Sequence, residues 1–197
     1  MHGLEGLLGR GGARPLTDAE IRLLRPVFAD AIDYPRVTVR TGGAKGPCGL
    51  RAHVVCDDVW LPADCAGPDG ALSARGRHVL LHEAGHVWQH QHGGTGYIAR
   101  ALAAQLLHGA RGVGTGEAYD WLAAARRGER FEAMNPEAQA ELGCWIGHAI
   151  GADGEVDRDA LERLLRAHAP GPAGALGDTT FATVRDAHDA LRGRPPR

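Results

Sequence analysis

Apolar residues recur at helical spacing in two long stretches of the chain. The first stretch follows Thr17, which can cap a helix, with Glu20 three residues later to complete a capping box. Its apolar positions are Ile21, Leu23, Leu24, Val27, Phe28 and Ile32. Pro26 lies within that pattern and predicts a kink or an early end, because proline removes a backbone donor. A second helix is predicted over residues 73–92, where two glycines stop it.

Two shorter stretches have the pattern of β-strands. Residues 36–40 place Val37 and Val39 on one face, and residues 52–61 are rich in the branched and aromatic side chains that strands favour. The segment 42–47 between them has the glycines and proline of a loop. We therefore expect a small sheet beside the helices.

The second half of the chain is predicted to be helical. One helix should begin at Pro136 with Asn135 as its cap. The other expected helices cover residues 98–108, 118–127, 159–169 and 179–191. The predicted class is thus α+β, mostly helical with a small sheet.

The chain is long enough for one domain with a substantial core, since it has 197 residues of which 44% are hydrophobic. We expect a flexible Gly-rich N-terminus, one domain, and then a C-terminal extension with a disordered tail. These parts are residues 1–15, 16–169 and 170–197, and the motifs described below fall within 16–150.

Charge and hydropathy limit the partners and the location. The net charge of −2, with arginines dispersed among acids, argues against a nucleic-acid partner. No run of about 18 apolar residues occurs, which argues against a membrane span. Residues 1–10 lack the basic region and apolar core of a signal peptide. We therefore expect a cytoplasmic protein unless a specialised machine exports it.

The four cysteines are Cys48, Cys56, Cys65 and Cys144, and no two of them form a CxxC pair. Free thiols are the favoured interpretation, because nothing indicates an oxidising compartment. A zinc site built from the first three with a histidine is not favoured, because their spacing is looser than that of known Cys-rich sites.

The second predicted helix carries the most informative motif, His82-Glu83-Ala84-Gly85-His86. Two histidines four positions apart project from nearly the same helical face, so both rings can bind a single ion. Glu83 lies one step round the helix and can act on a metal-bound water as general base. This HExxH pattern is typical of zinc peptidases. His78 and His90 continue the same spacing, and we interpret them as surface or supporting groups.

A catalytic zinc site usually takes three protein ligands, so a third must be found elsewhere. Glu137 and Glu141 lie four apart at the start of the helix that begins at Pro136. Glu137 could ligate the ion, and Glu141 could orient a histidine ring by accepting its other N–H. Alternatively, acidic residues in a first turn merely complement the helix dipole.

An aromatic residue outside the motif is a candidate for transition-state stabilisation. Tyr119 could hydrogen-bond the oxyanion of a tetrahedral intermediate. Core packing is the favoured role, because an aromatic side chain on a helix usually belongs to the core. Asp57 and Asp58 are interpreted as a turn or strand end rather than as metal ligands.

Taken together, these residues suggest a family. Over roughly residues 14–150 the chain resembles the bacterial Vgr-related proteins, which are zincin-like predicted metallopeptidases associated by name with type VI secretion spikes. They are similar to the metallopeptidase-like core domain found with contractile injection systems. The resemblance rests on Leu16 to Glu20, Val27-Phe28, Asp33-Tyr34, Val37, Cys56 to Asp58, His82-Glu83, His86 to Gln89, and Glu137 to Glu141.

The resemblance implies a zincin-like fold of the gluzincin type, with His82, His86 and Glu137 as ligands and Glu83 as base. It implies one zinc ion per chain. Zincins commonly place an edge strand along the cleft, and residues 52–61 are the candidate here. Ala84 and Gly85 depart from the family pattern, in which a larger residue followed by Thr is expected.

The expected function is zinc-dependent hydrolysis of peptide bonds by Glu-assisted attack of a zinc-bound water. The alternative is a metal-binding module that binds partners of a type VI or contractile injection system and cleaves nothing. The expected partners are a peptide or protein substrate and a secretion-spike component.

Overall fold

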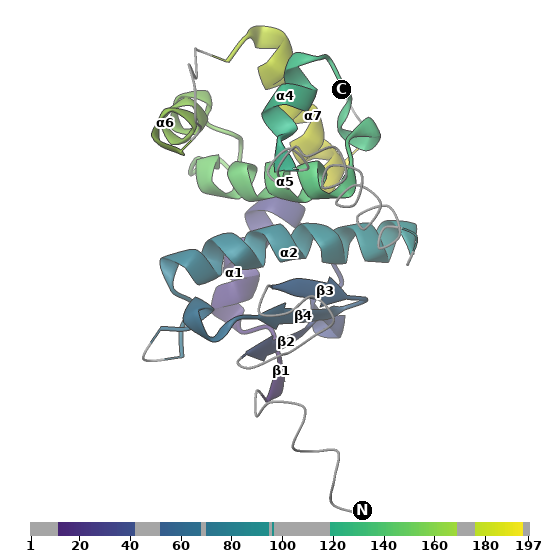
Figure 1. Cartoon of the computed structure of the whole chain (residues 1–197), viewed down its shortest axis with the longest axis vertical. Coiled ribbons are helices and arrows are strands. Elements are labelled where there is room, and N and C mark those ends of the chain that lie inside the picture. Colours follow the sequence, from purple (N-terminus) through teal and green to yellow (C-terminus); the bar gives the residue numbers. More distant parts are fainter. Residues whose placement is uncertain are drawn as a thin grey trace, which may run out of the picture.

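The computed structural model describes residues 12–41, 52–67, 70–94, 96, 119–168 and 176–194. In this part of the chain the architecture is α+β, with helices stacked on one side of a four-stranded sheet (Figure 1). Helix α2 (Ala74–Gly93) lies next to the sheet, and helix α5 (Pro136–Ala149) lies on the opposite side of α2. Beyond α5 lie α4 (Trp121–Arg126), α6 (Arg158–His168) and α7 (Asp178–Leu191).

The sheet has the strand order β1-β2-β4-β3, with bounds Ala13–Pro15, Thr38–Thr41, Asp58–Leu61 and His53–Val55 in that order. Strands β2 and β4 run parallel, and the outer pairs are antiparallel. Val39 and Val59 face each other at the centre and are fully buried. Their burial against the helices fixes the register of the sheet.

The single strand predicted over residues 52–61 is instead a hairpin of β3 and β4. The chain reverses at Cys56, whose φ of 58° is in the left-handed region, and at Asp57. So short a turn does not interrupt the run of strand-favouring residues in the sequence. The two strands therefore look like one in the sequence pattern. Of these two strands, β3 lies at an edge of the described sheet and β4 lies inside it.

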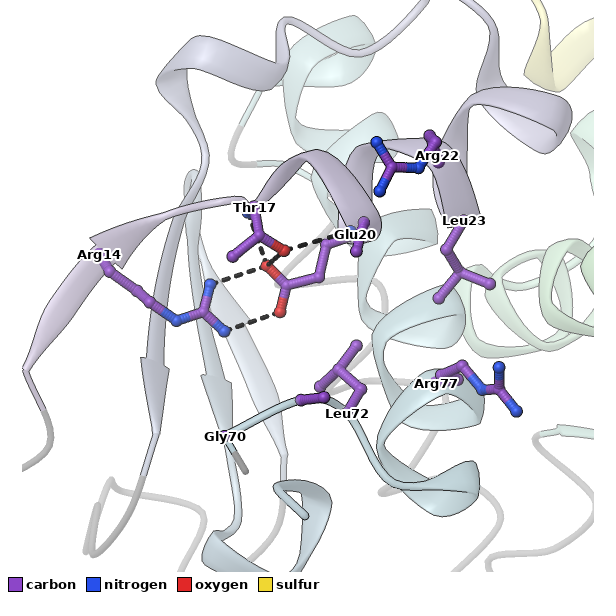
Figure 2. A pocket seen from close by; sticks show the side chains of 10 residues that line it. Arg14, Thr17, Glu20, Arg22, Leu23, Gly70, Leu72 and Arg77 are labelled. Atoms are coloured by element: carbon purple, nitrogen blue, oxygen red, sulfur yellow. Dashed lines mark hydrogen bonds and ion pairs between the residues drawn. The ribbon is translucent and has the colours of Figure 1, made fainter. Parts of the chain in front are cut away.

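Helix α1 (Asp18–Phe28) begins at the predicted capping box. Thr17 and Glu20 satisfy each other's backbone N–H groups, and Arg14 donates two hydrogen bonds of 2.7 Å to the Glu20 carboxylate (Figure 2). Burial alone would raise the pKa of Glu20, but Arg14 and Thr17 hold it below its ordinary value. A cavity of about 640 Å³ lies beside this ion pair, and none of the candidate metal ligands lines it.

Pro26 lies inside α1, which ends two residues later at Phe28. Ile32, predicted as an apolar position of this helix, lies outside it but is still buried. The strand predicted over residues 36–40 also starts later than expected, because Tyr34–Arg36 forms a 3₁₀ turn before β2.

Helix α2 is buried on both sides because it lies between the sheet and α5. Ser73 caps its start by accepting a hydrogen bond from the Gly76 N–H, and it ends at Gly93 as predicted. A helix in this position must be apolar or internally satisfied over most of its surface. The motif residues therefore sit in the interior of the fold.

The close approach of α2 to α5 depends on Gly85. A Cβ added there would lie 2.8 Å from Ala140 Cα and 2.9 Å from Ala140 Cβ. Both distances are shorter than a real carbon contact allows. The absence of a side chain at Gly85, inside the motif, thus lets the two helices touch.

The C-terminal helix belongs to the same core. Val184, Ala187 and Leu191 of α7 are buried, and α7 contacts α1, α4 and α5. Residues 13–15, expected within a flexible N-terminus, form strand β1 and pair with β2. Helix α7, expected within a C-terminal extension, is likewise part of the core. The predicted helix over 98–108 lies outside the described residues.

We expect Gly85→Ala to lower the free energy of unfolding by about 1–3 kcal/mol, because the methyl group would push α5 away from α2. Urea denaturation of the metal-free protein measures this. Gly143→Ala on α5 is the matched control, since its added Cβ would meet the Leu191 side chain at 3.4 Å and the Phe28 ring at 3.9 Å, both ordinary van der Waals contacts. The control should be neutral or stabilising through helix propensity. Equal stability of Gly85→Ala and wild type would contradict this account of the helix contact.

Candidate metal centre

The structure brings His82, His86 and Glu137 together at the interface of α2 and α5. The Glu137 Oε2 atom lies 3.4 Å from the Nε2 atom of each histidine. Donor atoms around a tetrahedral zinc ion are about 3.3 Å apart, given metal–ligand bonds of about 2.0–2.2 Å. Two imidazole nitrogens and one carboxylate oxygen in this arrangement suit a zinc ion with an open fourth position.

Helix geometry explains why these three side chains meet. The two histidines are one turn apart on the face of α2 that packs against α5. Asn135 caps α5 by accepting from the N–H groups of Glu137 and Ala138, as predicted, which places Glu137 in the first turn. Glu137 is buried, so its carboxylate needs the partners that the histidines supply.

Each histidine is oriented through its other ring nitrogen. His82 Nδ1 lies 3.0 Å from Glu141 Oε2, and His86 Nδ1 lies 2.9 Å from Gln89 Oε1. Because a carboxylate and an amide oxygen accept, both Nδ1 atoms carry hydrogen. When the rings are neutral, both Nε2 atoms are then available as metal ligands.

Gln89 is held in turn by α5. Its Nε2 donates to the Pro136 carbonyl at 2.8 Å and to Gln139 Oε1 at 3.0 Å. This fixes which end of the amide faces His86, and it links the orientation of His86 to the start of α5. The sequence pattern predicts no role for Gln89, although its position three residues after His86 is the signal that could have found it.

The electrostatics of the metal-free centre are dominated by its carboxylates. Burial alone would lower the pKa of His82, but Glu137 and Glu141 raise it to about 10. Burial would raise the pKa of Glu137, but His82 and His86 hold it well below its ordinary value. The pocket thus stabilises positive charge on its nitrogen atoms, whether that charge is a proton or a metal ion.

Glu83 occupies a different environment from Glu137. Burial raises the pKa of its carboxyl, and the neighbouring His82 and His86 offset only part of that effect. Its Oε2 atom is buried and has no hydrogen-bond partner among the described residues. An unsatisfied buried carboxylate oxygen is costly, and a metal-bound water beside the histidines would satisfy it. The residues present therefore fit a zinc ion with its water.

The remaining predicted site residues fall as follows. Tyr119 precedes α4, which begins at Trp121, and its ring centroid lies 5.6 Å from that of His82. Asp57 binds Arg36 and Gln91 and Asp58 lies near Arg40, so neither joins a described metal-ligating group. Cys56, Cys65 and Cys144 are free thiols, and Cys48 lies outside the described residues.

The comparisons with known proteins give one partial match. Part of the chain is similar to the type VI secretion system spike protein VgrG2b of Pseudomonas aeruginosa, with 36% identity over 84 residues. The match covers 41% of this chain and 8% of that protein, so the chain spans only a small part of its relative. No family model and no solved structure matches the chain. The similarity supports a link to the Vgr-related proteins and to type VI secretion.

No helix in the described ranges is both long enough and apolar enough to cross a membrane.

We expect Gln89→Ala to weaken zinc binding about 10–100-fold, because His86 loses the group that orients its ring. Competition with a zinc-sensitive chelating dye measures the affinity. Gln91→Ala is the matched control, because Gln91 lies on the same helix but bonds to Asp33 and Asp57 instead. An affinity that falls equally in both variants would show that Gln89 has no specific effect on the metal centre.

The metal-free protein should lose stability as pH rises from about 6.5 to about 10. Because the folded-state pKa of His82 is raised, the stability from its charged ring is fully present below the ordinary value of 6.5 and is lost as pH rises through about 10. We expect a loss of about 1–3 kcal/mol relative to His82→Gln. Urea denaturation at several pH values in the presence of a chelator measures it. Parallel pH profiles for the two proteins would contradict the expectation.

Proposed function

We propose that this chain is a zinc-dependent peptidase of the gluzincin type. The observation that carries the proposal is the placement of Glu83, with a buried oxygen that lacks a described partner, beside three converging zinc-type ligands. Two histidines and a glutamate are the ligand set of several zinc peptidases. A purely structural zinc site would be closed by a fourth protein ligand.

His82, His86 and Glu137 would hold the ion. Zinc bound there supplies a water of pKa near 7 and a Lewis acid that polarises the scissile carbonyl. Glu141 and Gln89 keep the two imidazole rings oriented through their Nδ1–H groups. Glu141 is itself held by a 2.9 Å hydrogen bond from the Trp145 indole N–H.

Glu83 is the proposed general base. Its buried carboxylate accepts a proton from the attacking water and returns it to the departing amine. Burial raises the pKa of this carboxyl, which brings its basicity nearer to that of a proton acceptor working at neutral pH. Tyr119 lies beside His82 and is the candidate donor to the oxyanion.

Strand β3 is the proposed docking edge for the substrate backbone. It lies at the edge of the described sheet and contacts α2. His53 on this strand is also among the groups whose charge acts on Glu83, so the edge borders the general base. An extended peptide that adds to such an edge gains main-chain hydrogen bonds and presents its carbonyl groups to the cleft.

The similarity to a secretion spike protein favours a role in type VI secretion. We propose that the peptidase acts with a spike component, either as exported cargo or on a protein of the apparatus. A non-catalytic module at the same place would share the metal centre but would not depend on Glu83.

Glu83→Gln should keep its zinc and lose peptide hydrolysis by about 100-fold or more, because the amide cannot accept the proton. Hydrolysis of fluorescently labelled casein and of a mixture of quenched peptides measures activity, and elemental mass spectrometry measures zinc. Glu132→Gln, at an exposed glutamate that pairs with Arg130, is the control and should retain both.

The two candidate functions predict different outcomes for these proteins. A zinc-loaded wild type without hydrolysis of either substrate, or full activity in Glu83→Gln, would reject the peptidase proposal. Binding to a spike component that persists in Glu83→Gln would then favour the non-catalytic module.

A further inference from the structure

A second group of metal-type ligands lies one helical turn from the first, at the same helix interface. His78 precedes His82 by four residues on α2, while Cys144 and His148 are four apart on α5. Cys144 is fully buried, and both histidine rings are exposed to solvent on one side. Neither Cys144 nor His148 has a role in the proposed peptidase reaction.

The donor atoms of this group converge. His78 Nδ1 lies 3.2 Å from His148 Nε2 and 3.3 Å from Cys144 Sγ. For a tetrahedral zinc ion with Zn–N near 2.0–2.1 Å and Zn–S near 2.3 Å, two nitrogens are about 3.3 Å apart and nitrogen and sulfur about 3.6 Å. The two distances from His78 Nδ1 are therefore close to those that a shared ion requires, and the donor atoms of all three residues lie within 4.8 Å of one another.

The same contacts make a poor hydrogen-bond network. The single Nδ1 atom of His78 faces two partners, Cys144 Sγ and His148 Nε2, while the thiol also lies 3.3 Å from the His78 carbonyl. Burial lowers the pKa of both histidines, and the positive charge of His78 lowers the pKa of His148 further. Neutral imidazoles are the form that binds metals.

A cavity of about 270 Å³ opens onto this group, lined by Trp145, Leu164 and His168 together with the two histidines. It provides room for a fourth ligand, which is either a water molecule or the His168 ring of α6. His168 uses Nδ1 to bond the Leu164 carbonyl, which leaves Nε2 as its ligand atom.

We propose that His78, Cys144 and His148 form a second zinc site that joins α2 to α5. One thiolate and two imidazoles are borderline-soft donors that suit zinc and exclude calcium and magnesium, which prefer oxygen ligands. Zinc binding here displaces the thiol proton, because a coordinating thiol is deprotonated. This site is independent of the peptidase proposal, which needs only the first ion.

The second site would hold the helix pair in register beside the first. Glu141 accepts from His82 at one oxygen and from Trp145 at the other, and Trp145 lines the cavity of the second site. A metal ion that ties His78 to Cys144 and His148 fixes the turn of α5 that carries this tryptophan. The two centres are thus linked through one carboxylate.

Cobalt(II) added to the metal-free full chain is the direct test, because a thiolate ligand gives cobalt a near-ultraviolet charge-transfer band. Wild type and Glu137→Gln should both develop the band, which should saturate at one equivalent of thiolate-bound cobalt. Cys144→Ser should lose it, and Cys56→Ser, which changes an exposed thiol, should keep it. Zinc content should be two per chain in wild type and one in Cys144→Ser.

His148→Gln is the second variant, because its exposed ring can be replaced without disturbing the buried core. It should also bind one zinc and keep the far-ultraviolet circular dichroism of wild type. A band that persists in Cys144→Ser, or two zinc ions retained in His148→Gln, would overturn the second site. A wild type that binds one zinc ion, with the same zinc content in Glu137→Gln and the cobalt band intact in both, would instead count against the peptidase centre.

Discussion

The contact between α2 and α5 is the constraint on which the functional chemistry depends. Gly85 and Ala140 let the two helices approach so closely that no Cβ fits at the glycine. His86 directly follows Gly85, and His86 and His82 meet Glu137 of α5 at this interface. A larger side chain at position 85 would separate the helices and draw Glu137 away from both histidines. Glycine at position 85 is therefore a packing requirement of this chain.

The closely packed interface also sets the electrostatics. Two carboxylates of α5 surround His82, and their effect on its pKa exceeds that of burial. Such a concentration of buried polar groups costs stability unless each group is satisfied. Glu137 and Glu141 find partners in the histidines, whereas one Glu83 oxygen finds none among the described residues. The fold thus tolerates one unsatisfied carboxylate oxygen at the proposed general base, and such local exceptions are typical of functional sites.

The sequence predicted the local features that depend on near neighbours. The capping box at Thr17, the Asn135 cap with Pro136, and the end of α2 at Gly93 are all confirmed. The hairpin within 52–61 was missed because a two-residue turn does not interrupt the run of strand-favouring residues. Gln89 and the Cys144 group were missed for a different reason. Gln89 contacts His86 three residues away, but the α5 groups that hold Gln89 and the α2 groups that meet Cys144 are more than 40 residues distant in the chain, and only the packing of α5 on α2 brings them together.

The spacing of four residues on both helices explains why two groups of ligands arise. His78, His82 and His86 on α2 face Glu137, Glu141, Cys144 and His148 on α5, so the same interface repeats at successive turns. The chemistry changes along it, from two histidines with a carboxylate to two histidines with a thiol. The carboxylate end lies near strand β3 and Glu83, where a peptide and a base can meet. The thiol end lies beside Trp145 and α6, away from any described strand edge, which suits it to hold the helices together rather than to catalyse.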